Sequence, residues 1–442
     1  MAHPEHSRGP GFLRAVLREQ ARLARIRPVA PARLLFRVGR WWTRTVLRES
    51  APQLALIGIA VLAVLLLIGA ESGTVGVVAI GLAAIGALSE IRQGWLAHRS
   101  TARIEEALDG IEAPADDAPR VPRSHLLVPP LAFVTRGVER RRGVRFATLE
   151  DGTKLRLDVY RPAGDDPHDD DPQPAVIQVH GGGWLAGSRY EQGIPLLNHL
   201  ASIGWVGFNI DYRLSPQATW PDHVVDVKRA IAWVRANAEE LGIDPRMICL
   251  TGGSAGGHLT ALAALTPGDP DLQPGFEEAD TAVQAAVPFY GVYDLADSNG
   301  FYYPELREYV FEKLVFKRPF AGHEELYRSA SPLSRIHSAA PPFLVIHGER
   351  DTLVPVEDAR FFAERLRSVS RADVRYVELP GAEHAFDLWP SERTARISEG
   401  IGRFLTAVAR DEGRGPDDSA VAGDEVLDRT SGSDQDAAAR TG

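Results

Sequence analysis

The 442-residue sequence has almost no cysteine and no general excess of positive charge. Its only cysteine, Cys249, cannot form an internal disulfide, so no oxidising compartment is required. Because it lies in the apolar run 246–250, we interpret it as a small buried hydrophobic residue. The net charge of −10 argues against a general nucleic-acid-binding protein.

Charge is nearly absent from residues 50–89, where Glu71 is the only charged residue. The uncharged stretches 50–70 and 72–89 each approach the ~20 residues that cross a bilayer as a helix. They predict a transmembrane helical hairpin over residues 50–90. A cleaved signal peptide fits poorly, because the apolar part begins late and follows a large basic region. A buried core hairpin is the alternative interpretation, although such long uncharged stretches are unusual in soluble cores.

Positive charge flanks this hairpin on both sides and is missing from its turn. The flanking residues are Arg33, Arg37, Arg40, Arg44, Arg48, Arg92, Arg99 and Arg103. Because cytoplasmic flanks carry the excess of Lys and Arg, we expect a two-span protein of the cell membrane, with the large domain that follows the hairpin in the cytoplasm. The basic N-terminal arm, residues 1–49, suits either an anionic membrane surface or a solvated arm.

The remaining chain divides by composition. Residues 91–130 contain a proline-rich acidic stretch and are assigned to a linker, and the acidic tail 411–442 is expected to be disordered. The large folded domain, which holds the candidate functional residues described below, is bounded at 131–410. The acidic loop 162–174 lacks the turn glycine of a calcium loop, so we interpret it as solvated and expect no metal.

Short apolar runs alternate with amphipathic stretches inside residues 131–410. Strands are predicted at 144–149, 155–160, 175–179, 206–210, 247–250, 282–289, 343–346 and 374–378. Helices are predicted near 192–202, 222–240, 255–265, 356–368 and 391–409. This alternation predicts an α/β fold with a mostly parallel sheet and helices on both faces.

The segment Cys249–His258 reads C-L-T-G-G-S-A-G-G-H and places G-x-S-x-G between a predicted strand and a predicted helix. This is the context of a nucleophile elbow, in which a sharp turn exposes the serine. Gly252 and Gly256 fit positions where crowded backbones leave no room for a Cβ. Ser254 is therefore the candidate nucleophile.

A second glycine motif, H-G-G-G-W at His180–Trp184, follows the predicted strand 175–179. Three glycines at a strand end allow backbone N–H groups to turn toward a reacting carbonyl oxygen. A dinucleotide-binding loop does not fit, because no G-x-G-x-x-G opens a helix here. We interpret His180 as a residue that fixes the loop.

In α/β-hydrolases an acid and then a histidine follow the serine along the chain. Asp351 comes directly after the predicted strand 343–346, and His384 follows the predicted strand 374–378. They complete a candidate triad with Ser254. Glu383 and Asp358 are weaker candidates for the acid. His347 is interpreted as packing, and His258 has no partner acid in the sequence.

Residues 140–405 resemble the hormone-sensitive-lipase-like and acetyl-esterase-like branch of the α/β-hydrolases. The resemblance rests on His180–Trp184, Asp211–Pro216, Gly252–His258, Asp351 and His384. It implies that the N–H groups of Gly182, Gly183 and Ala255 form the oxyanion hole. Many relatives have Asp where Gly253 stands, which places this chain on the acetyl-esterase-like side. The hairpin and the basic arm lie outside the resemblance.

The expected chemistry is ester hydrolysis without a metal or organic cofactor. His384 would accept the proton of Ser254 while Asp351 fixes the imidazole tautomer, and an acyl-enzyme would follow. The expected partner is a small-molecule or lipid ester. An amidase, arylformamidase or acyltransferase would use the same triad and stays open. A prolyl-oligopeptidase-like peptidase fits less well, and a non-enzymatic membrane scaffold would need no triad.

A cap insertion is expected at 292–333, where the strand and helix rhythm breaks. Its aromatic residues are predicted partly to line an apolar acyl pocket and partly to pack in the core: Phe301, Tyr302, Tyr303, Tyr309, Phe311, Phe316 and Phe320. Trp184, Tyr290 and Phe386 are further candidates for the substrate pocket.

Overall fold

The computed structural model describes most of the catalytic region and part of the N-terminal region. The described residues are 31–49, 57–61, 63–64, 67, 73–112, 120–121, 135–164 and 171–413. Several predicted segments lie largely or partly outside them: most of the basic arm, most of the first apolar stretch, residues 113–119 and 122–130 of the linker, the centre of the acidic loop and nearly all of the acidic tail.

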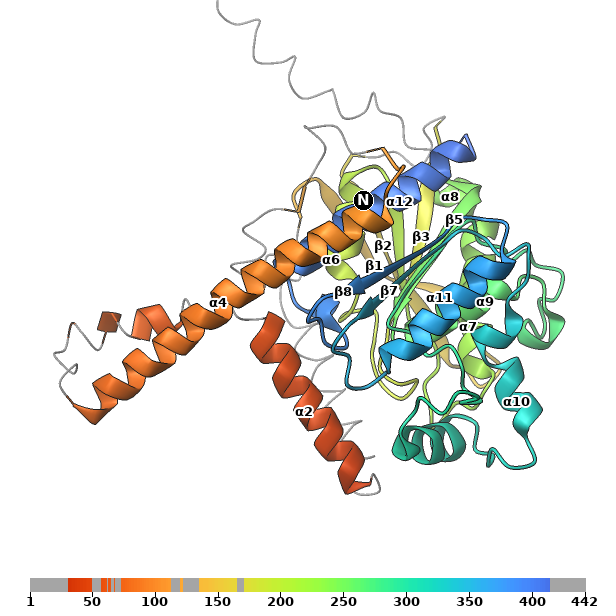
Figure 1. The fold of residues 1–442 in the computed structure, drawn as a ribbon. Coiled ribbons are helices and arrows are strands. Elements are labelled where there is room, and N and C mark those ends of the chain that lie inside the picture. Colours follow the sequence, from red (N-terminus) through yellow and green to blue (C-terminus); the bar gives the residue numbers. More distant parts are fainter. Residues whose placement is uncertain are drawn as a thin grey trace, which may run out of the picture.

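One eight-stranded sheet organises the catalytic domain (Figure 1). Its strands are β1 (Val138–Thr148), β2 (Lys154–Pro162), β3 (Gln173–Val179), β4 (Val206–Ile210), β5 (Ile243–Gly253), β6 (Ala286–Phe289), β7 (Phe343–Gly348) and β8 (Val374–Leu379). Their order across the sheet is β1-β2-β4-β3-β5-β6-β7-β8. The pairs β1–β2 and β2–β4 are antiparallel, and every other pair is parallel. The prediction of a mostly parallel sheet is confirmed.

Helices cover both faces of this sheet, as the alternating pattern predicted (Figure 1). One face carries α6 (Ile194–Ser202) and α12 (Glu392–Asp411), which pack in one apolar cluster. The other face carries α7 (Asp222–Ala236), α9 (Ala255–Leu265) and α11 (Val356–Val369), with the short α8 (Ala238–Leu241) after α7. Strands that are buried on both faces consist of continuous apolar runs. This is why β3 and β4 could be predicted from the sequence.

The parallel strands deliver the motif residues to one edge of the sheet. The H-G-G-G-W segment follows β3, Ser254 follows β5, and the loops with Asp351 and His384 follow β7 and β8. Carboxyl ends of parallel strands lie at the same edge, where α/β proteins place their ligand sites. The topology therefore brings together residues more than a hundred positions apart, such as Ser254 and His384.

The expected cap insertion, residues 292–333, contains a π-helical stretch (Glu305–Val315) and the short α10 (Glu324–Ser329). Of the seven aromatic residues named in the sequence analysis, four are buried in the core, namely Tyr302, Tyr309, Phe311 and Phe316. Phe301, Tyr303 and Phe320 are partly exposed. About half of the aromatic set therefore packs the fold, and only the partly exposed residues are free to border a pocket.

Before the catalytic domain, the described residues include the helices α2 (Ala32–Glu49) and α4 (Thr74–Ala107). The assignment of residues 91–107 to a linker is wrong, because these residues continue α4 and pack against α12 and β8. Buried side chains recur here at every fourth residue, namely Leu96, Ser100, Ile104 and Leu108. This spacing places them on one helix face, and the charged residues between them hid the pattern in the sequence.

The predicted hairpin over residues 50–90 is only partly described. Residues 57–61 are helical, and a Cβ on Gly58 would lie 3.9 Å from the Cα of Ala83 in α4, so the two segments lie side by side. Within the part of the chain that the structure describes, no helix is both long and apolar enough to cross a membrane. The two predicted spans are therefore not supported by the described residues.

Candidate active site

Ser254 occupies a strained turn between β5 and α9. Its φ of 57° and ψ of −119° are rarely adopted by a residue with a side chain, and its N–H donates to Phe289 O at 2.9 Å. A Cβ on Gly252 or Gly256 would approach Val179 O to 2.6 or 2.2 Å, which no side chain tolerates. The glycines of the elbow thus allow the nucleophile turn to pack directly against the end of β3.

The side chains of Ser254, His384 and Asp351 are joined by hydrogen bonds. His384 Nδ1 lies 2.6 Å from Asp351 Oδ2, and His384 Nε2 lies 2.8 Å from Ser254 Oγ. A carboxylate only accepts, so Nδ1 carries the proton and Nε2 is left to accept from the serine hydroxyl. The structure therefore brings the three predicted residues together in the order needed to activate a serine.

The surroundings of Asp351 keep its carboxyl ionised. Burial alone would raise its pKa, but the neighbouring His384 and hydrogen bonds from His347 and His384 outweigh this and hold the pKa below its usual range. The other carboxylate oxygen accepts from the backbone N–H groups of Leu353 at 2.9 Å and Val354 at 2.8 Å. A charged acceptor is thus maintained in a fully buried position.

His347 takes part in the site, although the sequence suggested only packing. Its Nε2 lies 3.1 Å from Asp351 Oδ2 and 3.1 Å from Val354 O. It is buried at the end of β7, so its imidazole faces the same carboxylate oxygen as His384. One feature of the sequence could have indicated this role: His347 stands at the end of a predicted strand, directly before the loop that carries Asp351.

The weaker candidates for the acid have other partners. Glu383 Oε1 accepts from Thr352 N at 2.6 Å, and Asp358 accepts from Tyr293 N at 2.7 Å and from the hydroxyl of Tyr302. Burial raises the pKa of Asp358 to about 7. Asp358 therefore ties the cap to α11 rather than acting on His384.

The glycine loop that carries two of the predicted oxyanion residues adjoins Ser254. A Cβ on Gly181 would lie 3.2 Å from Ser254 Cβ, so the glycine loop passes beside the nucleophile. Gly182 and Gly183 adopt φ values of 116° and 62°, and a Cβ on Gly182 would meet Ala186 O at 2.1 Å. Among the described residues, no acceptor engages the N–H groups of Gly182, Gly183 or Ala255. Gly182, Gly183 and Ala255 therefore remain the candidates for the oxyanion hole.

The three predicted pocket residues are buried. Trp184 donates from Nε1 to His258 Nδ1 at 3.2 Å, and Phe386 packs against Phe289 and Tyr290. Tyr290 lies beneath the histidine, with ring centroids 4.6 Å apart. The prediction that these residues line the substrate pocket is therefore not supported, because packing beneath the site leaves them at most 1% exposed.

The N-terminal helix α2 also reaches the site. Trp41 Nε1 donates to His384 O at 2.8 Å, and Arg37 lies 4.0 Å above the Tyr303 ring in the cap. The buried carboxylate of Glu49 pairs with Arg393 of α12. No sequence pattern indicates these contacts, since Trp41 lies 343 positions from His384 in a segment interpreted as a basic arm.

Similar proteins support the same interpretation. The BD-FAE family model matches residues 157–366. The probable carboxylic ester hydrolase LipM of Mycobacterium tuberculosis is 52% identical over 53% of this chain and 54% of its own length. Esterase LipC of the same organism is 46% identical over 69% of this chain and 74% of its own length. The chain thus spans about half of LipM and about three quarters of LipC.

A solved structure shares the fold. The thermophilic esterase Est2 of the Planctomycetes species Thermogutta terrifontis is 28% identical and has a TM-score of 0.52. The similarity covers 64% of this chain and 95% of that chain. The N-terminal helices lie before the matched family region, which begins at residue 157. Together with the geometry of the site, these similarities establish that the chain belongs to the hormone-sensitive-lipase-like carboxylesterases of the α/β-hydrolase superfamily.

Proposed function

We propose that this protein is a serine carboxylesterase that hydrolyses carboxylic esters through an acyl-enzyme on Ser254. The observation that carries the proposal is the hydrogen-bonded chain from Asp351 through His384 to Ser254. His384 takes the proton of the attacking hydroxyl, and Asp351 stabilises the imidazolium that forms. His384 then returns the proton to the leaving alcohol.

The negative charge of the tetrahedral intermediate needs preorganised donors. We assign this role to the N–H groups of Gly182, Gly183 and Ala255, which border the nucleophile. In acyl-transfer enzymes one such donor contributes about 3 kcal/mol to transition-state stabilisation. Water, activated by the same histidine, then attacks the acyl-enzyme and releases the acid.

An amidase or arylformamidase would use the same triad, so the leaving group that the enzyme accepts distinguishes these activities from the proposed esterase. We expect the full chain in mild detergent to hydrolyse p-nitrophenyl esters and to leave the matching p-nitroanilides intact. The series should run from acetyl to lauroyl, with release of nitrophenol or nitroaniline followed by absorbance. Faster cleavage of the anilides would contradict the ester assignment, and ester formation with an added alcohol in place of hydrolysis would indicate an acyltransferase.

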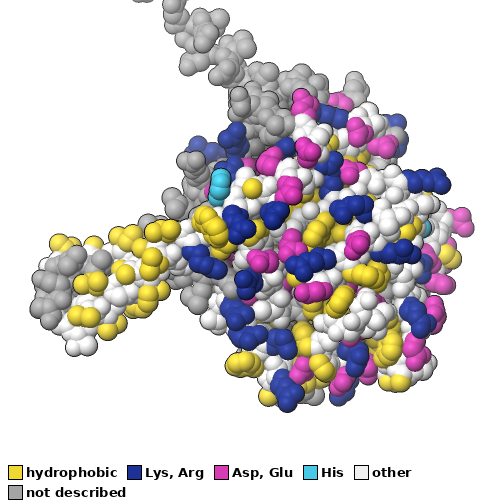
Figure 2. All heavy atoms as spheres, in the orientation of Figure 1, with side chains coloured by type: hydrophobic (Ala, Val, Ile, Leu, Met, Phe, Trp, Pro, Cys, Tyr) yellow, Lys and Arg dark blue, Asp and Glu magenta, His cyan; other side chains and the backbone are white. Residues whose placement is uncertain are grey.

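We also propose that the enzyme is attached to a membrane through residues 50–90. In support, the part of α4 that projects from the body exposes apolar side chains (Figures 1 and 2). They include Val75, Val77, Val78, Ile80, Leu82, Ile85, Leu88 and Ile91, each at least 48% exposed. Extended apolar surfaces of this kind are seldom left in water. A lipophilic ester drawn from the same membrane is the matching substrate class.

For the topology we expect two spans, with the catalytic domain in the cytoplasm. The physical reason is the arginines on both outer flanks and the lack of Lys and Arg in the turn. A green fluorescent protein fused after Ser124 should fluoresce, and an alkaline phosphatase at the same point should be inactive. Fusions after Arg44 should give the same pair of results. An active phosphatase after Ser124 with an inactive one after Arg44 would indicate a single span.

A further inference from the structure

Three polar side chains from separate segments meet behind the nucleophile. They are Gln192 in the loop before α6, Tyr290 at the end of β6 and Asp387 after the histidine. Gln192 Nε2 lies 2.6 Å from Tyr290 OH, and Tyr290 OH donates to Asp387 Oδ1. Gln192 Nε2 also lies 3.3 Å from Asp387 Oδ2. The residues thus form one connected set, which lies outside the triad.

This set joins the two loops that the reaction requires, the glycine loop and the loop that carries His384. Gln192 Oε1 accepts from Gly181 N at 2.6 Å, directly before the candidate oxyanion donors. At the other end, Asp387 lies in the turn that follows His384, and the Tyr290 ring packs beside the imidazole. Only the amide oxygen of Gln192 can accept from Gly181, so its NH₂ group must face Tyr290 and Asp387.

The protonation of Tyr290 fits this direction of hydrogen bonds. Burial and the nearby carboxylate of Asp387 raise the pKa of Tyr290 well above its usual range. Its hydroxyl therefore keeps its proton, accepts from Gln192 and donates to Asp387. Every polar group along the path from Gly181 to Asp387 has a complementary partner.

Backbone strain is concentrated at the same place. Tyr290 has a φ of 34° and Ala385 a φ of 57°, both in the left-handed region that residues with side chains avoid. Such conformations cost roughly 1–3 kcal/mol each and persist only where the surroundings hold them. Hydrogen bonds at Tyr290 and at Asp387, two positions beyond Ala385, supply such a restraint.

Gly253 shows how close this set lies to the nucleophile. A Cβ at this position would lie 2.4 Å from Gln192 Nε2 and 2.7 Å from Tyr290 OH. The space beside residue 253 is therefore filled by Gln192 and Tyr290. The three side chains therefore lie directly behind Gly253, the residue before Ser254.

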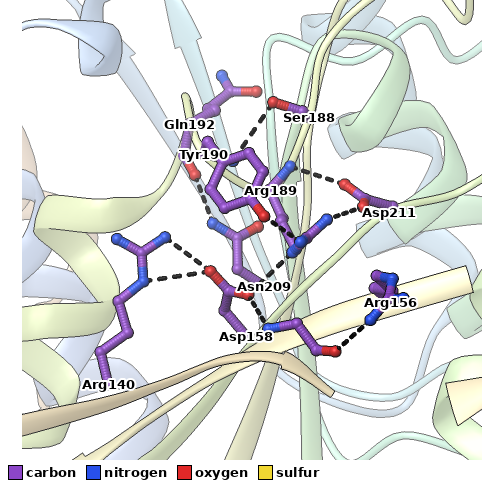
Figure 3. Close-up of polar contacts among 10 residues, drawn as sticks. Arg140, Arg156, Asp158, Ser188, Arg189, Tyr190, Gln192, Asn209 and Asp211 are labelled. Atoms are coloured by element: carbon purple, nitrogen blue, oxygen red, sulfur yellow. Dashed lines mark hydrogen bonds and ion pairs between the residues drawn. The ribbon is translucent and has the colours of Figure 1, made fainter. Parts of the chain in front are cut away.

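The backbone of Gln192 is held independently of its side chain. Asn209 Nδ2 donates to Gln192 O at 2.9 Å, and the loop is anchored by Arg189, which pairs with Asp158 and Asp211 (Figure 3). Arg140 also binds Asp158. A substitution of the Gln192 side chain should therefore leave the loop in place and remove only its contacts.

We propose that Gln192, Tyr290 and Asp387 form a clamp that fixes the distance between the oxyanion loop and the histidine loop around Ser254. The inference rests on the proposed esterase function and assigns positioning residues to it. An oxyanion donor acts only within about 2.7–3.1 Å of the developing charge. Because this requirement is strictest in the transition state, loss of the clamp should lower kcat more than it changes KM.

Two substitutions test the clamp on the full-length protein with a p-nitrophenyl ester. Tyr290→Phe removes the central hydroxyl, and Gln192→Met keeps the side-chain length without its hydrogen bonds. We expect each to lower kcat by about 10²-fold, the effect of misplacing reacting groups by about 1 Å, with KM changed little. The double substitution should be no worse than the stronger single one, because both break the same path.

Affinity for a trifluoromethyl ketone gives a second readout, since its adduct with Ser254 places an oxyanion in the hole. Its Ki should rise in parallel with the fall in kcat/KM. Tyr160→Phe is the matched control, because Tyr160 is fully buried and its hydroxyl has no hydrogen-bond partner among the described residues. This control should leave kcat, KM and Ki unchanged.

The outcomes separate the clamp from the esterase function. Wild-type protein that neither hydrolyses the ester nor reacts with a fluorophosphonate would contradict the proposed function itself. If the wild type is active, unchanged kcat and Ki in Gln192→Met would overturn the clamp. A loss confined to KM, or losses that multiply in the double variant, would overturn it as well. Gln192→Met decides the question if Tyr290→Phe fails to fold.

Discussion

Ser254→Ala should reduce ester hydrolysis by roughly 10⁶-fold in kcat, the loss seen when a triad nucleophile is removed from a serine hydrolase. The hydroxyl is the atom that becomes acylated, and the described site offers no other serine within hydrogen-bond distance of His384 Nε2. The same variant should no longer be labelled by a fluorophosphonate probe. Turnover of a p-nitrophenyl ester and in-gel labelling measure the two effects.

The fold should survive this substitution. The turn depends on Gly252 and Gly256, whose hydrogens lie against the end of β3, and alanine keeps the Cβ that Ser254 already carries at a φ of 57°. The melting temperature should therefore stay close to that of the wild type. Ser368→Ala, an exposed serine in α11 whose hydroxyl bonds only its own helix backbone, is the matched control. Labelling that persists in Ser254→Ala would point to another nucleophile.

Much of the catalytic domain was predictable because its signals are local. Buried parallel strands read as apolar runs, and β4 and α9 lie where the pattern placed them. The order of serine, acid and histidine along the chain then indicated Asp351 and His384. Since parallel strands end at one edge of the sheet, residues at strand ends meet there without any detailed knowledge of packing.

The contacts that the sequence concealed are long-range and involve ordinary residue types. Trp41 binds the backbone of His384, and Gln192 reaches Asp387 across 195 positions, so neither belongs to a motif with fixed spacing. Residues 91–107 were assigned to a linker together with the proline-rich acidic stretch that follows them, and charged residues interrupt their apolar spacing. Their helix is stabilised by tertiary packing on α12, which no composition rule reveals.

The side chains of the candidate pocket residues are buried for a related reason. A motif indicates which residues adjoin the chemistry but not which way a side chain points. Trp184 follows two glycines in the left-handed region and itself has a φ of 60°, so its indole turns into the core and bonds His258. Tyr290 turns in the same way beneath His384, where its hydroxyl belongs to the clamp.

Asp351→Asn should lower kcat by about 10⁴-fold, as in other triad enzymes that lose this charge. The carboxylate accepts four hydrogen bonds, from His384 and His347 on one oxygen and from Leu353 and Val354 on the other. An asparagine has one oxygen and one NH₂ group. If the NH₂ group faces His384, the imidazole must carry its proton on Nε2 and can no longer accept from Ser254.

The opposite orientation of the asparagine is no better, because its NH₂ group then faces two backbone N–H donors in a buried position. A buried donor without an acceptor costs about 1–3 kcal/mol, so the variant should also be less stable than the wild type. Its kcat and melting temperature are compared with those of Glu383→Gln. Glu383 contacts the same loop through Thr352 N but is not the partner of His384 Nδ1. We expect Glu383→Gln to retain most of its activity, and a reversed ranking of the two variants would move the role of the acid from Asp351 to Glu383.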